Sequence, residues 1–366
     1  MSIRSDLLGV LNGSTSKKLP WFGDLSYYYQ SLQRRGLLEK KHEGPEGEKR
    51  FYMDMGVGIY LYAPNVYRVN YGQEVNYSEV TNQDRIVARF ETPIGTIESV
   101  QQYNRQAFCY DYVKRCVDTI EDLRIMRYVY EKTRYFENYE EYLSRERLWG
   151  EEGIGFALGE ACMAPVQKLL SRWAGIEQTV FLAQEHPEEF RDIVHSIEQS
   201  QDDMVRVLAG SPAQIVALPE NLSSDVTGEF LFREFNMPYY VHISTMLHAT
   251  NKKVAIHIDG RLRPCLGMLS ACGMDIAEAV TPAPFGDIAI EGLRGIAGKE
   301  LILWGGLPGG VFSPVCSDET FEEIVTKAIR CADSKFVLGV ADQVPPDAIP
   351  WRIRRVRELV DASPRL

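Results

Sequence analysis

The C-terminal part of the chain alternates short apolar runs with helical segments, and this alternation limits the fold more than any other feature. From about residue 210 the runs are QIVALPE (214–220), KVAIHID (253–259), DIAEAVTP (275–282), LILWGGLP (301–308) and FVLGVAD (336–342). Ala, Val, Ile and Leu dominate each run, which is typical of strands covered on both faces. Strands that alternate with helices form βαβ units, so the pattern predicts a parallel sheet.

Helical patterns separate these runs, and the alternation continues upstream. The predicted helices lie near 229–250, 262–273, 286–298, 319–332 and 348–361. GIGFALGE (153–160) predicts a further strand, and LPWFGDL (19–25) predicts the first one. About eight parallel strands indicate an α/β fold of the (β/α)8 TIM barrel type. A doubly wound open sheet is the alternative, but no G-x-G-x-x-G motif follows the first strand.

The N-terminal part has a different pattern. YRVNYGQEVNY and RIVARFETPIGTIESVQQY alternate polar and apolar residues and are rich in Val, Tyr and Thr. Such stretches predict antiparallel hairpins rather than βα units, whereas residues 117–147 have a charged helical pattern. We therefore predict one barrel domain over residues 1–366, with a β-rich hairpin insertion at about 51–105.

Charge and cysteine usage limit the partners and the compartment. The net charge of −11 and the pI near 5.2 argue against nucleic acid and anionic membranes as partners. The chain contains no run of about 18 apolar residues, so we predict no membrane span. The N-terminus lacks the apolar core of a signal peptide. The seven cysteines are scattered and form no C-x-x-C pair. We therefore expect a cytoplasmic protein with reduced thiols.

Polar residues stand at the carboxyl ends of the predicted strands. Glu220 ends the first run, His257 and Asp259 end the second, Trp304 lies near the end of the fourth, and Asp342 ends the last. Residues two apart in a strand point to the same side, which puts His257 beside Asp259. Because all strand ends of a parallel barrel face the same mouth, these residues are predicted to converge on one site.

Each of these residues also has a structural interpretation. A lone histidine in a strand is commonly a hydrogen-bonded core residue. The position of Glu220 also fits a charge at a helix N-terminus, and that of Trp304 also fits a packing residue. The position of His257 beside Asp259 and opposite Glu220 favours a site. Cys265 and Cys272 fall on an apolar helical stripe, which favours the core over a metal site.

Several of these stretches resemble the uroporphyrinogen decarboxylase superfamily. The resemblance rests on HIDG, GMDIAEAVTPAPFGD, LILWGGLPGG and FVLGVADQVPPDAIPWRIRRV, with GIGFALGEACMAPVQKLL and PWFGDLSYYYQSL standing where two further blocks begin. It extends over nearly the whole chain and is weakest over 40–130. It implies a (β/α)8 barrel, which agrees with the strand pattern.

The resemblance implies one of two activities, and the first is decarboxylation without a cofactor. The true decarboxylases hold their substrate with arginines in the first block and carry a histidine after Leu-Gly in the last block. Here PWFGDLSYYYQ contains no arginine, and Val340 and Ala341 follow Leu-Gly. Without basic groups a polycarboxylated tetrapyrrole has little to hold it. Decarboxylation is therefore the alternative prediction.

The second branch contains zinc methyltransferases that work with corrinoid proteins, and the chain resembles it more closely. Members that methylate a thiol show H-x-C-G and a late cysteine, whereas here Asp259 and Ala341 stand at or near those positions. This departure argues against a thiol acceptor, while a set of histidine and carboxylates remains a zinc site. The predicted zinc ligands, which are also the predicted catalytic residues, are His257, Glu220 and Asp259, with Glu234 or Asp342 in reserve.

The resemblance and the residues together predict a methyltransferase. Zinc would polarise an ether oxygen as a Lewis acid, so that a methyl group moves from a small methoxylated donor to a corrinoid protein in an O-demethylation. Aromatic methyl ethers are among the candidate donors. We expect zinc and a partner-borne corrinoid as cofactors, no nucleic acid or membrane partner, and an assembly compatible with a homodimer. A non-catalytic protein that kept the barrel is a third hypothesis. The predicted substrate-binding residues are Trp21, Asp24, Tyr28, Trp304 and Asp342.

Overall fold

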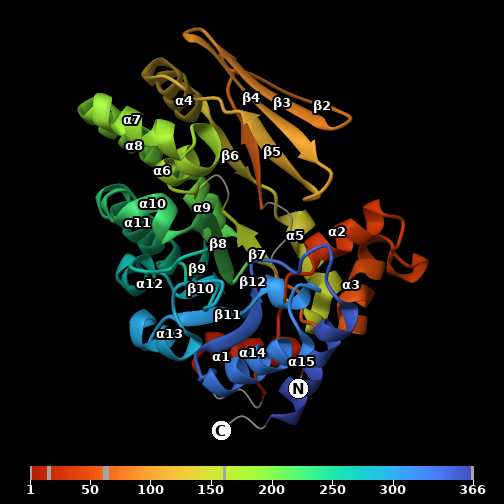
Figure 1. Ribbon diagram of the computed structural model, residues 1–366. Coiled ribbons are helices and arrows are strands. Elements are labelled where there is room, and N and C mark those ends of the chain that lie inside the picture. Colours follow the sequence, from red (N-terminus) through yellow and green to blue (C-terminus); the bar gives the residue numbers. More distant parts are fainter. Residues whose placement is uncertain (1, 15–17, 61–65, 160–161, 364–366) are drawn as a thin grey trace.

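Within the part of the chain that the structure describes, six parallel strands form the main sheet (Figure 1). The computed structural model describes residues 2–14, 18–60, 66–159 and 162–363. The strands lie in the order β12-β11-β10-β9-β8-β7, and every neighbouring pair is parallel. This confirms the predicted α/β fold. The strands are β7 (Phe156–Leu158), β8 (Ile215–Leu222), β9 (Lys253–Ile258), β10 (Ile276–Val280), β11 (Ile302–Pro308) and β12 (Phe336–Ala341).

Isolated parallel bridges continue from the β12 edge of this sheet. They join Trp21 to Leu338, Phe22 to Gly58, and Ile59 to Gly153. The predicted first strand, LPWFGDL, thus lies beside β12, and Gly153 stands shortly before β7 in the chain. The bridges thus lead from β12, at one edge of the sheet, to the segment just before β7, at the other edge.

Amphipathic helices cover the outer face of the parallel strands (Figure 1). In α14 the buried residues Phe321, Val325 and Ala328 recur at helical spacing and face the sheet side. Ser317 caps this helix by accepting a hydrogen bond from the amide of Thr320 at 3.2 Å. The helices that follow β7 to β12 are α6 (Pro165–Lys168), α7 (Ile176–Glu185), α8 (Pro187–Ser200), α9 (Asp202–Gly210), α10 (Ser224–Leu231), α11 (Met237–His248), α12 (Cys265–Met268), α13 (Ile290–Ala297), α14 (Asp318–Cys331) and α15 (Pro350–Ala362).

Two of the described helical segments are π-helices, and short 3-10 turns join other elements. The π-helix η4 (Leu169–Trp173) extends α6, and η5 (Phe232–Asn236) joins α10 to α11. The 3-10 segments are η1 (Lys40–His42), η2 (Gly150–Glu152), η6 (Ser270–Cys272) and η7 (Gly309–Phe312). Within the described ranges, no helix has the length and apolar character needed to cross a membrane. All seven cysteines lie in the described part, and each is a free thiol.

An apolar cluster lies on the inner side of the parallel strands. The ring of Trp304 lies 4.6 Å from that of Tyr60, 5.6 Å from that of Phe22 and 5.4 Å from that of Phe156, measured between ring centroids. Helix α1 (Ile3–Leu11) adds its buried leucines and Val10 to the same cluster. These aromatic rings fill the interior on the side of the α1 helix.

A four-stranded antiparallel sheet forms a separate layer beside α4, at the top of Figure 1. Its strands are β2 (Asn76–Asn82), β3 (Arg85–Thr92), β4 (Gly95–Asn104) and β5 (Cys109–Lys114). Ile97 of the sheet shares an apolar cluster with Ile125 and Met126 of α4 (Ile120–Lys132). The antiparallel strands therefore begin and end later than the predicted range of about 51–105. Residues 51–55 instead end the helix α3 (Gly44–Met55), whose N-terminal neighbour is α2 (Ser26–Arg34).

The helical prediction for 117–147 is wrong at its centre. The short strand β6 (Arg134–Glu137) separates α4 from α5 (Tyr139–Trp149) and pairs antiparallel with β1 (Tyr67–Asn70). Thr133 ends α4 in an extended conformation, and its side chain donates a hydrogen bond to the carbonyl of Val129 at 2.7 Å. Charge pattern alone does not reveal this break, because β6 is also polar.

Candidate functional site

The carboxyl edge of the parallel sheet holds a histidine–glutamate pair. His257 of β9 and Glu278 of β10 stand opposite each other on neighbouring strands. The Nδ1 atom of His257 lies 2.5 Å from Oε2 of Glu278, and the Tyr60 hydroxyl donates to Oε1 at 2.7 Å. Both carboxylate oxygens are therefore engaged. The other ring nitrogen of His257, Nε2, lies 3.8 Å from Oδ1 of Asp342.

Unusual backbone conformations surround this pair. Ala279 has φ +67°, and the pairing of β10 with β11 shifts register between Glu278 and Val280. Asn221 at the end of β8 and Asp342 after β12 also have positive φ values, +47° and +64°. Such conformations are strained for residues with a Cβ and concentrate at functional sites, and bulges redirect side chains. We infer that the irregular strand ends hold the pair in position.

Two adjoining cavities open at this edge. The inner one has a volume of about 320 Å³ and contains the His257–Glu278 pair. The outer one has a volume of about 350 Å³ and includes Asp259 and Phe285. Asp342 and Gln343 line both. None of the described residues that line either cavity is a lysine or an arginine. The inner cavity is lined by Leu158, Ala217, Pro219, Asn221, Ala255, His257, Glu278, Asp342 and Gln343.

The carboxylates around His257 determine its charge. Burial alone would lower the pKa of His257, but the negative charges of Glu278, Asp342 and Asp259 together outweigh burial and raise it to about 9. At neutral pH the ring is therefore an imidazolium. Because Nδ1–H is held by Glu278, the Nε2–H bond is the one available to a molecule in the cavity.

The second carboxylate of the inner cavity is a weaker acid than usual. Burial raises the pKa of Asp342 to about 6, the positive charge of His257 opposes the increase, and the charge of Asp259 adds to it. The site therefore combines a persistent proton donor, His257, with a carboxylate that titrates near neutrality.

Glu220 does not join this group, although the sequence predicted that it would. Ala217, Pro219 and Asn221 face the inner cavity, so the alternation of a strand turns Glu220 to the opposite side. Its Oε1 accepts a hydrogen bond from the amide of Ala164 at 3.0 Å. Burial raises the pKa of Glu220 to about 7, although the amide of Ala164 and the nearby Tyr240 hydroxyl oppose the increase.

The predicted zinc ligands are therefore not assembled as a set. Among the described residues, no group of three or more His, Cys, Asp or Glu side chains is placed to hold a metal ion. His257 and Asp342 are close, Asp259 lies in the adjoining cavity, and Glu220 points away. The reserve ligand Glu234 is 2.8 Å from Arg191 in a half-exposed ion pair. The donor set His257, Glu220 and Asp259 does not fit a zinc centre in this arrangement.

The predicted substrate-binding residues divide into two groups. Asp342 lines both cavities, and Asp24 contacts them indirectly because its Oδ2 accepts a hydrogen bond from Nε2 of Gln343 at 2.9 Å. Trp21, Tyr28 and Trp304 are buried and line neither cavity. Their side chains belong to the apolar clusters of the interior.

The sequence interpretation missed Glu278 and Tyr60. Glu278 is the one carboxylate in IAEAV, a strand whose five residues are all buried. A charge in such a strand requires a partner, so the signal was present. Tyr60 gives no comparable signal, because only the folded chain brings it to Glu278, 218 residues away.

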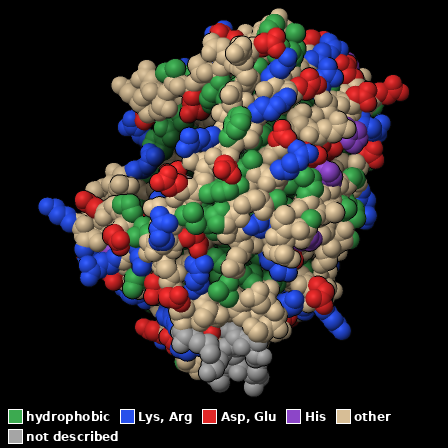
Figure 2. Space-filling model, turned by 180° about the vertical axis from the view of Figure 1, so that it is seen from behind, with side chains coloured by type: hydrophobic (Ala, Val, Ile, Leu, Met, Phe, Trp, Pro, Cys, Tyr) green, Lys and Arg blue, Asp and Glu red, His purple; other side chains and the backbone are tan. Residues whose placement is uncertain are grey.

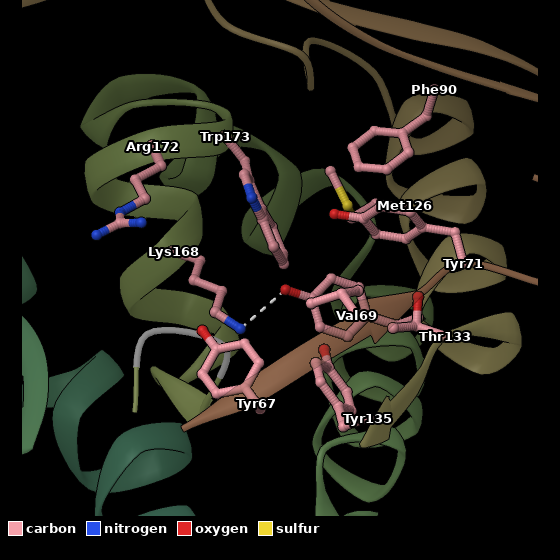
Figure 3. A pocket seen from close by; sticks show the side chains of 11 residues that line it. Tyr67, Val69, Tyr71, Phe90, Met126, Thr133, Tyr135, Lys168, Arg172 and Trp173 are labelled. Atoms are coloured by element: carbon pink, nitrogen blue, oxygen red, sulfur yellow. Dashed lines mark hydrogen bonds between the residues drawn. The ribbon is translucent and has the colours of Figure 1, made fainter. Parts of the chain in front are cut away.

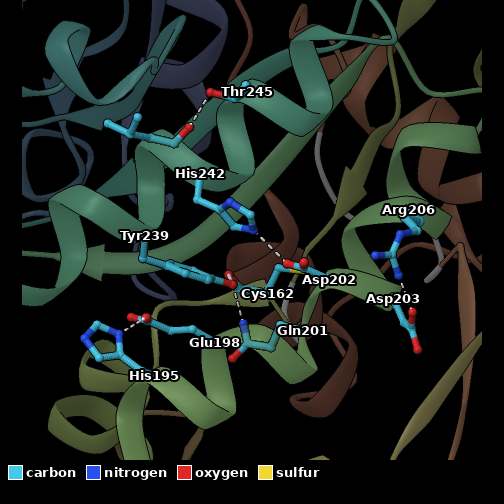
Figure 4. A network of polar contacts seen from close by, with 11 residues as sticks. Cys162, His195, Glu198, Gln201, Asp202, Asp203, Arg206, Tyr239, His242 and Thr245 are labelled. Carbon is cyan, nitrogen blue, oxygen red and sulfur yellow. Dashed lines mark hydrogen bonds and ion pairs between the residues drawn. The ribbon is translucent and has the colours of Figure 1, made fainter. Parts of the chain in front are cut away.

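A polar network supports the outer side of β8 (Figure 4). The Tyr239 hydroxyl donates to the carbonyl of Cys162 at 3.0 Å, and Nε2 of Gln201 donates to the carbonyl of Met163 at 3.1 Å. His242 pairs with Asp202 at 2.8 Å. The network fixes the chain that supplies the Ala164 amide to Glu220, and it places His242 in a peripheral ion pair.

Comparison with known proteins adds a family to this geometry. The profile described as uroporphyrinogen decarboxylase (URO-D) matches residues 153–363, more than half of the chain. The chain belongs to the uroporphyrinogen decarboxylase family. The matched segment contains His257, Glu278 and Asp342. No curated protein sequence is similar enough to this chain to count as a match.

Two solved structures align with this family member over most of its length. A methyltransferase from Methanosarcina mazei superimposes with a TM-score of 0.60 at 11% identity, with 99% of each chain covered. A protein from Listeria monocytogenes described as a vitamin B12-independent methionine synthase gives a TM-score of 0.40 at 8% identity, with 93% of this chain and 96% of that chain covered. At 11% identity, the first match establishes a common fold.

Proposed function

We propose that the protein is a methyltransferase that moves a methyl group from a small methoxylated donor to a corrinoid protein. The family membership and the fold shared with a methyltransferase support this reaction type. One observation carries the proposal. His257 is an imidazolium whose Nδ1–H is held by Glu278 and whose Nε2 lies beside Asp342 in a cavity at the sheet edge.

In the proposed reaction His257 acts as the general acid. The C–O bond of the methyl ether breaks, its electron pair stays on the oxygen, and Nε2–H donates its proton to that oxygen. The donor leaves as a free hydroxyl compound, and solvent restores the proton. The reduced corrinoid of the partner supplies the electron pair that takes up the methyl group. Glu278 stabilises the imidazolium before the step and orients its ring.

The acid strength of His257 favours an aromatic donor. A phenolic oxygen has an ordinary pKa of about 10, as in tyrosine. A proton donor with a pKa of about 9 is well matched to a phenolate leaving group, and an aliphatic alkoxide is far more basic. Phe285 and Tyr27 of the outer cavity add aromatic surface at its entrance. A methoxylated aromatic compound is therefore the donor class that we propose.

The charge of the cavities argues against the runner-up, decarboxylation of a polycarboxylated tetrapyrrole. The described lining residues include Glu278, Asp342 and Asp259 and contain no lysine or arginine. Such a surface repels carboxylates. The same argument applies to smaller polyacids, whereas a neutral methyl ether has no such penalty.

Zinc has no part in the proposed step, since the predicted ligands do not converge. The zinc expectation from the family resemblance is kept as a prediction, with His257 and Asp342 as the closest pair of possible donors. The partner corrinoid protein likewise rests on the resemblance. It would approach the carboxyl edge of the sheet, where the cavities open.

We infer further that the parallel strands close into the predicted (β/α)8 barrel, with residues 20–22 and 57–59 as its first two strands. The bridges from Leu338 to Trp21, from Phe22 to Gly58 and from Ile59 to Gly153 support closure. The antiparallel sheet at 76–114 would then be an insertion between the second and third strands of one domain spanning 1–366.

The experiment combines the protein with chemically reduced corrinoid, free or protein-bound, and a panel of aryl and alkyl methyl ethers. We expect the Co(I) absorption to convert to that of methyl-Co(III) with aryl ethers, and the demethylated phenol to appear in equal amount. Loss of conversion in His257→Gln would tie the reaction to this site. Release of carbon dioxide from uroporphyrinogen, with no methylation from any donor, would favour the runner-up instead.

A further inference from the structure

The outer cavity at the carboxyl edge of the sheet combines two carboxylates with two aromatic rings. Asp259 and Asp342 supply the carboxylates, and Tyr27 and Phe285 supply the rings. None of the described residues that line this cavity is a lysine, an arginine or a histidine. Asp342 also lines the inner cavity, so a ligand in the outer cavity can extend toward His257.

A lining without basic residues is not a general property of the cavities in this protein. A third cavity, shown in Figure 3, has Lys168 and Arg172 in its lining, and none of its described lining residues is an aspartate or a glutamate. On the outer surface, Lys and Arg side chains are interspersed with Asp and Glu over the face shown in Figure 2. The outer cavity therefore differs in charge both from the third cavity and from this mixed surface.

The carboxylates of the two cavities outnumber the positive group between them. Asp259 and Asp342 line the outer cavity, while Glu278 and Asp342 line the inner one beside His257. The charge of Asp259 acts on both cavities, because it contributes to raising the pKa of His257 after Glu278 and Asp342, and that of Asp342 after burial. Three carboxylates thus surround one imidazolium, which leaves an excess of negative charge.

Two arginines near the outer cavity do not supply the missing positive charge. Arg35 donates to the carbonyl of Pro346 at 2.8 Å and to Oγ of Ser31 at 3.2 Å. Arg261 forms an ion pair with Asp225 at 3.3 Å. Neither arginine lines the outer cavity, and each is engaged by groups outside its lining. A ligand in the outer cavity therefore meets carboxylates without a basic side chain among them.

The ring of Phe285 is held in place at the outer cavity. A Cβ atom on Gly310 would lie 2.6 Å from Cε1 of Phe285, so this ring packs directly against the glycine backbone. The amide of Gly286 donates to the carbonyl of Pro282 at 3.0 Å and closes the turn that carries Phe285. The side chain is nevertheless 51% exposed. A fixed aromatic ring beside carboxylates favours an organic cation, because the ring and the carboxylates both attract positive charge.

We propose that the methyl donor carries an ammonium group in addition to its methoxy group, and that the outer cavity binds this ammonium group. The inference rests on the proposed function, because the methoxy end of the donor reacts at His257. The ammonium group would donate hydrogen bonds to Asp259 and Asp342, and its carbon chain would pack against Phe285 and Tyr27. A methoxylated aromatic amine is thus accepted, and a methoxylated aromatic acid is repelled.

The test compares three ligands that differ in one substituent: 4-methoxybenzylamine, 4-methoxybenzyl alcohol and 4-methoxybenzoate. Isothermal titration calorimetry of the full chain at about pH 7.5, without corrinoid, measures their binding independently of methyl transfer. An alkyl amine is protonated at this pH. We expect the amine to bind about tenfold or more tightly than the alcohol, because only the amine is charged, and the benzoate not to bind measurably.

Two variants locate the preference for the amine in the outer cavity. Asp259→Asn should reduce the ratio of the alcohol and amine dissociation constants by about fivefold or more. Phe285→Leu should reduce the same ratio by about two- to fivefold, the contribution of one ring to binding a cation. The ratio is the measurement because a general structural defect weakens both ligands alike. The matched control is Asp84→Asn, whose aspartate pairs with Arg105 at 2.7 Å and lines neither cavity, and it should leave the ratio unchanged.

Methyl transfer from the same three ligands separates this inference from the proposed function. Tight binding of the amine, with no transfer from any of the three to reduced corrinoid, would count against methyl transfer and leave the ammonium site in place. Transfer from 4-methoxybenzoate as fast as from the amine would overturn the ammonium site and leave methyl transfer in place. Equal binding of the amine and the alcohol, no binding of the amine, or a preference that survives both Asp259→Asn and Phe285→Leu would also overturn the ammonium site.

Discussion

The Nδ1 atom of His257 lies 2.5 Å from Oε2 of Glu278, across two neighbouring parallel strands. This contact fixes which ring nitrogen faces the cavity and keeps the ring charged. A second hydrogen bond, from Tyr60 to Oε1, prevents the carboxylate from rotating away.

Replacing His257 tests its role as the proton donor. We expect His257→Gln to lower the rate of methyl transfer by about 10²- to 10⁴-fold, which is the usual contribution of general acid catalysis. The measurement is the initial rate of methyl-Co(III) formation with an aryl methyl ether. The matched control is His248→Gln, since His248 pairs with Asp275 at 2.8 Å on the periphery. Comparable rates in the two variants would remove His257 from the reaction.

Neutralising Glu278 tests what holds the charge on His257. Glu278→Gln keeps an acceptor for Tyr60 but removes the negative charge that contributes most to raising the pKa of His257. We expect that pKa to fall toward its ordinary value of about 6.5. The alkaline limb of the rate profile should move to lower pH by the same amount. NMR titration of the His257 ring measures the shift directly, and an unchanged titration would contradict this account.

The same pKa predicts how stability depends on pH. The pKa of His257 in the folded protein, about 9, exceeds its ordinary value of about 6.5. Its contribution to stability is therefore fully present below about pH 6.5 and is lost as the pH rises through about 9. The shift corresponds to at most roughly 3 kcal/mol. Urea unfolding at pH 6.5 and pH 9.5 should show the difference between wild type and His257→Gln shrinking with pH.

Much of this arrangement was predictable from the sequence. The apolar runs identified the parallel strands, because buried strands need continuous apolar residues. Residues two apart share a side, and His257 and Asp259 line the two adjoining cavities at this edge. Asp342 was found because it directly follows an apolar run. Each of these predictions needed only local periodicity.

Other features depended on contacts that the sequence does not encode locally. The position of Glu220 near a strand end predicts that it joins the site, but its neighbours Pro219 and Asn221 face the cavity. The side chain of Glu220 between them therefore points to the other face of β8. Trp304 was a predicted wall, yet the stack with Tyr60 and Phe22 places it in the apolar interior. The end of a strand is easier to predict than the direction of each side chain, because a bulge changes which face of the sheet the following side chains point to.

Glu220→Gln tests that Glu220 is a buried structural group. Its pKa in the folded protein, about 7, is above its ordinary value of about 4.3. The folded state therefore loses stability as the pH rises through about 7, because the Glu220 carboxylate must ionise while it is buried. The glutamine can still accept from the Ala164 amide. We expect Glu220→Gln to be more stable than wild type at pH 8.5 and close to it at pH 5.

The activity of this variant provides the control. Because Glu220 points away from both cavities, Glu220→Gln should retain methyl transfer within about twofold. Glu198→Gln is a useful comparison, since Glu198 pairs with His195 at 2.8 Å on a peripheral helix. A large loss of activity in Glu220→Gln alone would return Glu220 to the site.

Elemental analysis of purified protein tests the zinc prediction. His257 Nε2 and Asp342 Oδ1 are 3.8 Å apart, whereas Glu220 is held by the Ala164 amide on the opposite side of β8. We therefore expect bound zinc to be lost in His257→Gln and Asp342→Asn and kept in Glu220→Gln. Zinc lost only in Glu220→Gln would show that β8 rearranges on metal binding so that the Glu220 side chain faces the cavity. If protein without zinc transfers the methyl group, and His257→Gln abolishes that transfer, the leaving oxygen is activated without the metal. Proton donation by the imidazolium that Glu278 holds then accounts for the activation.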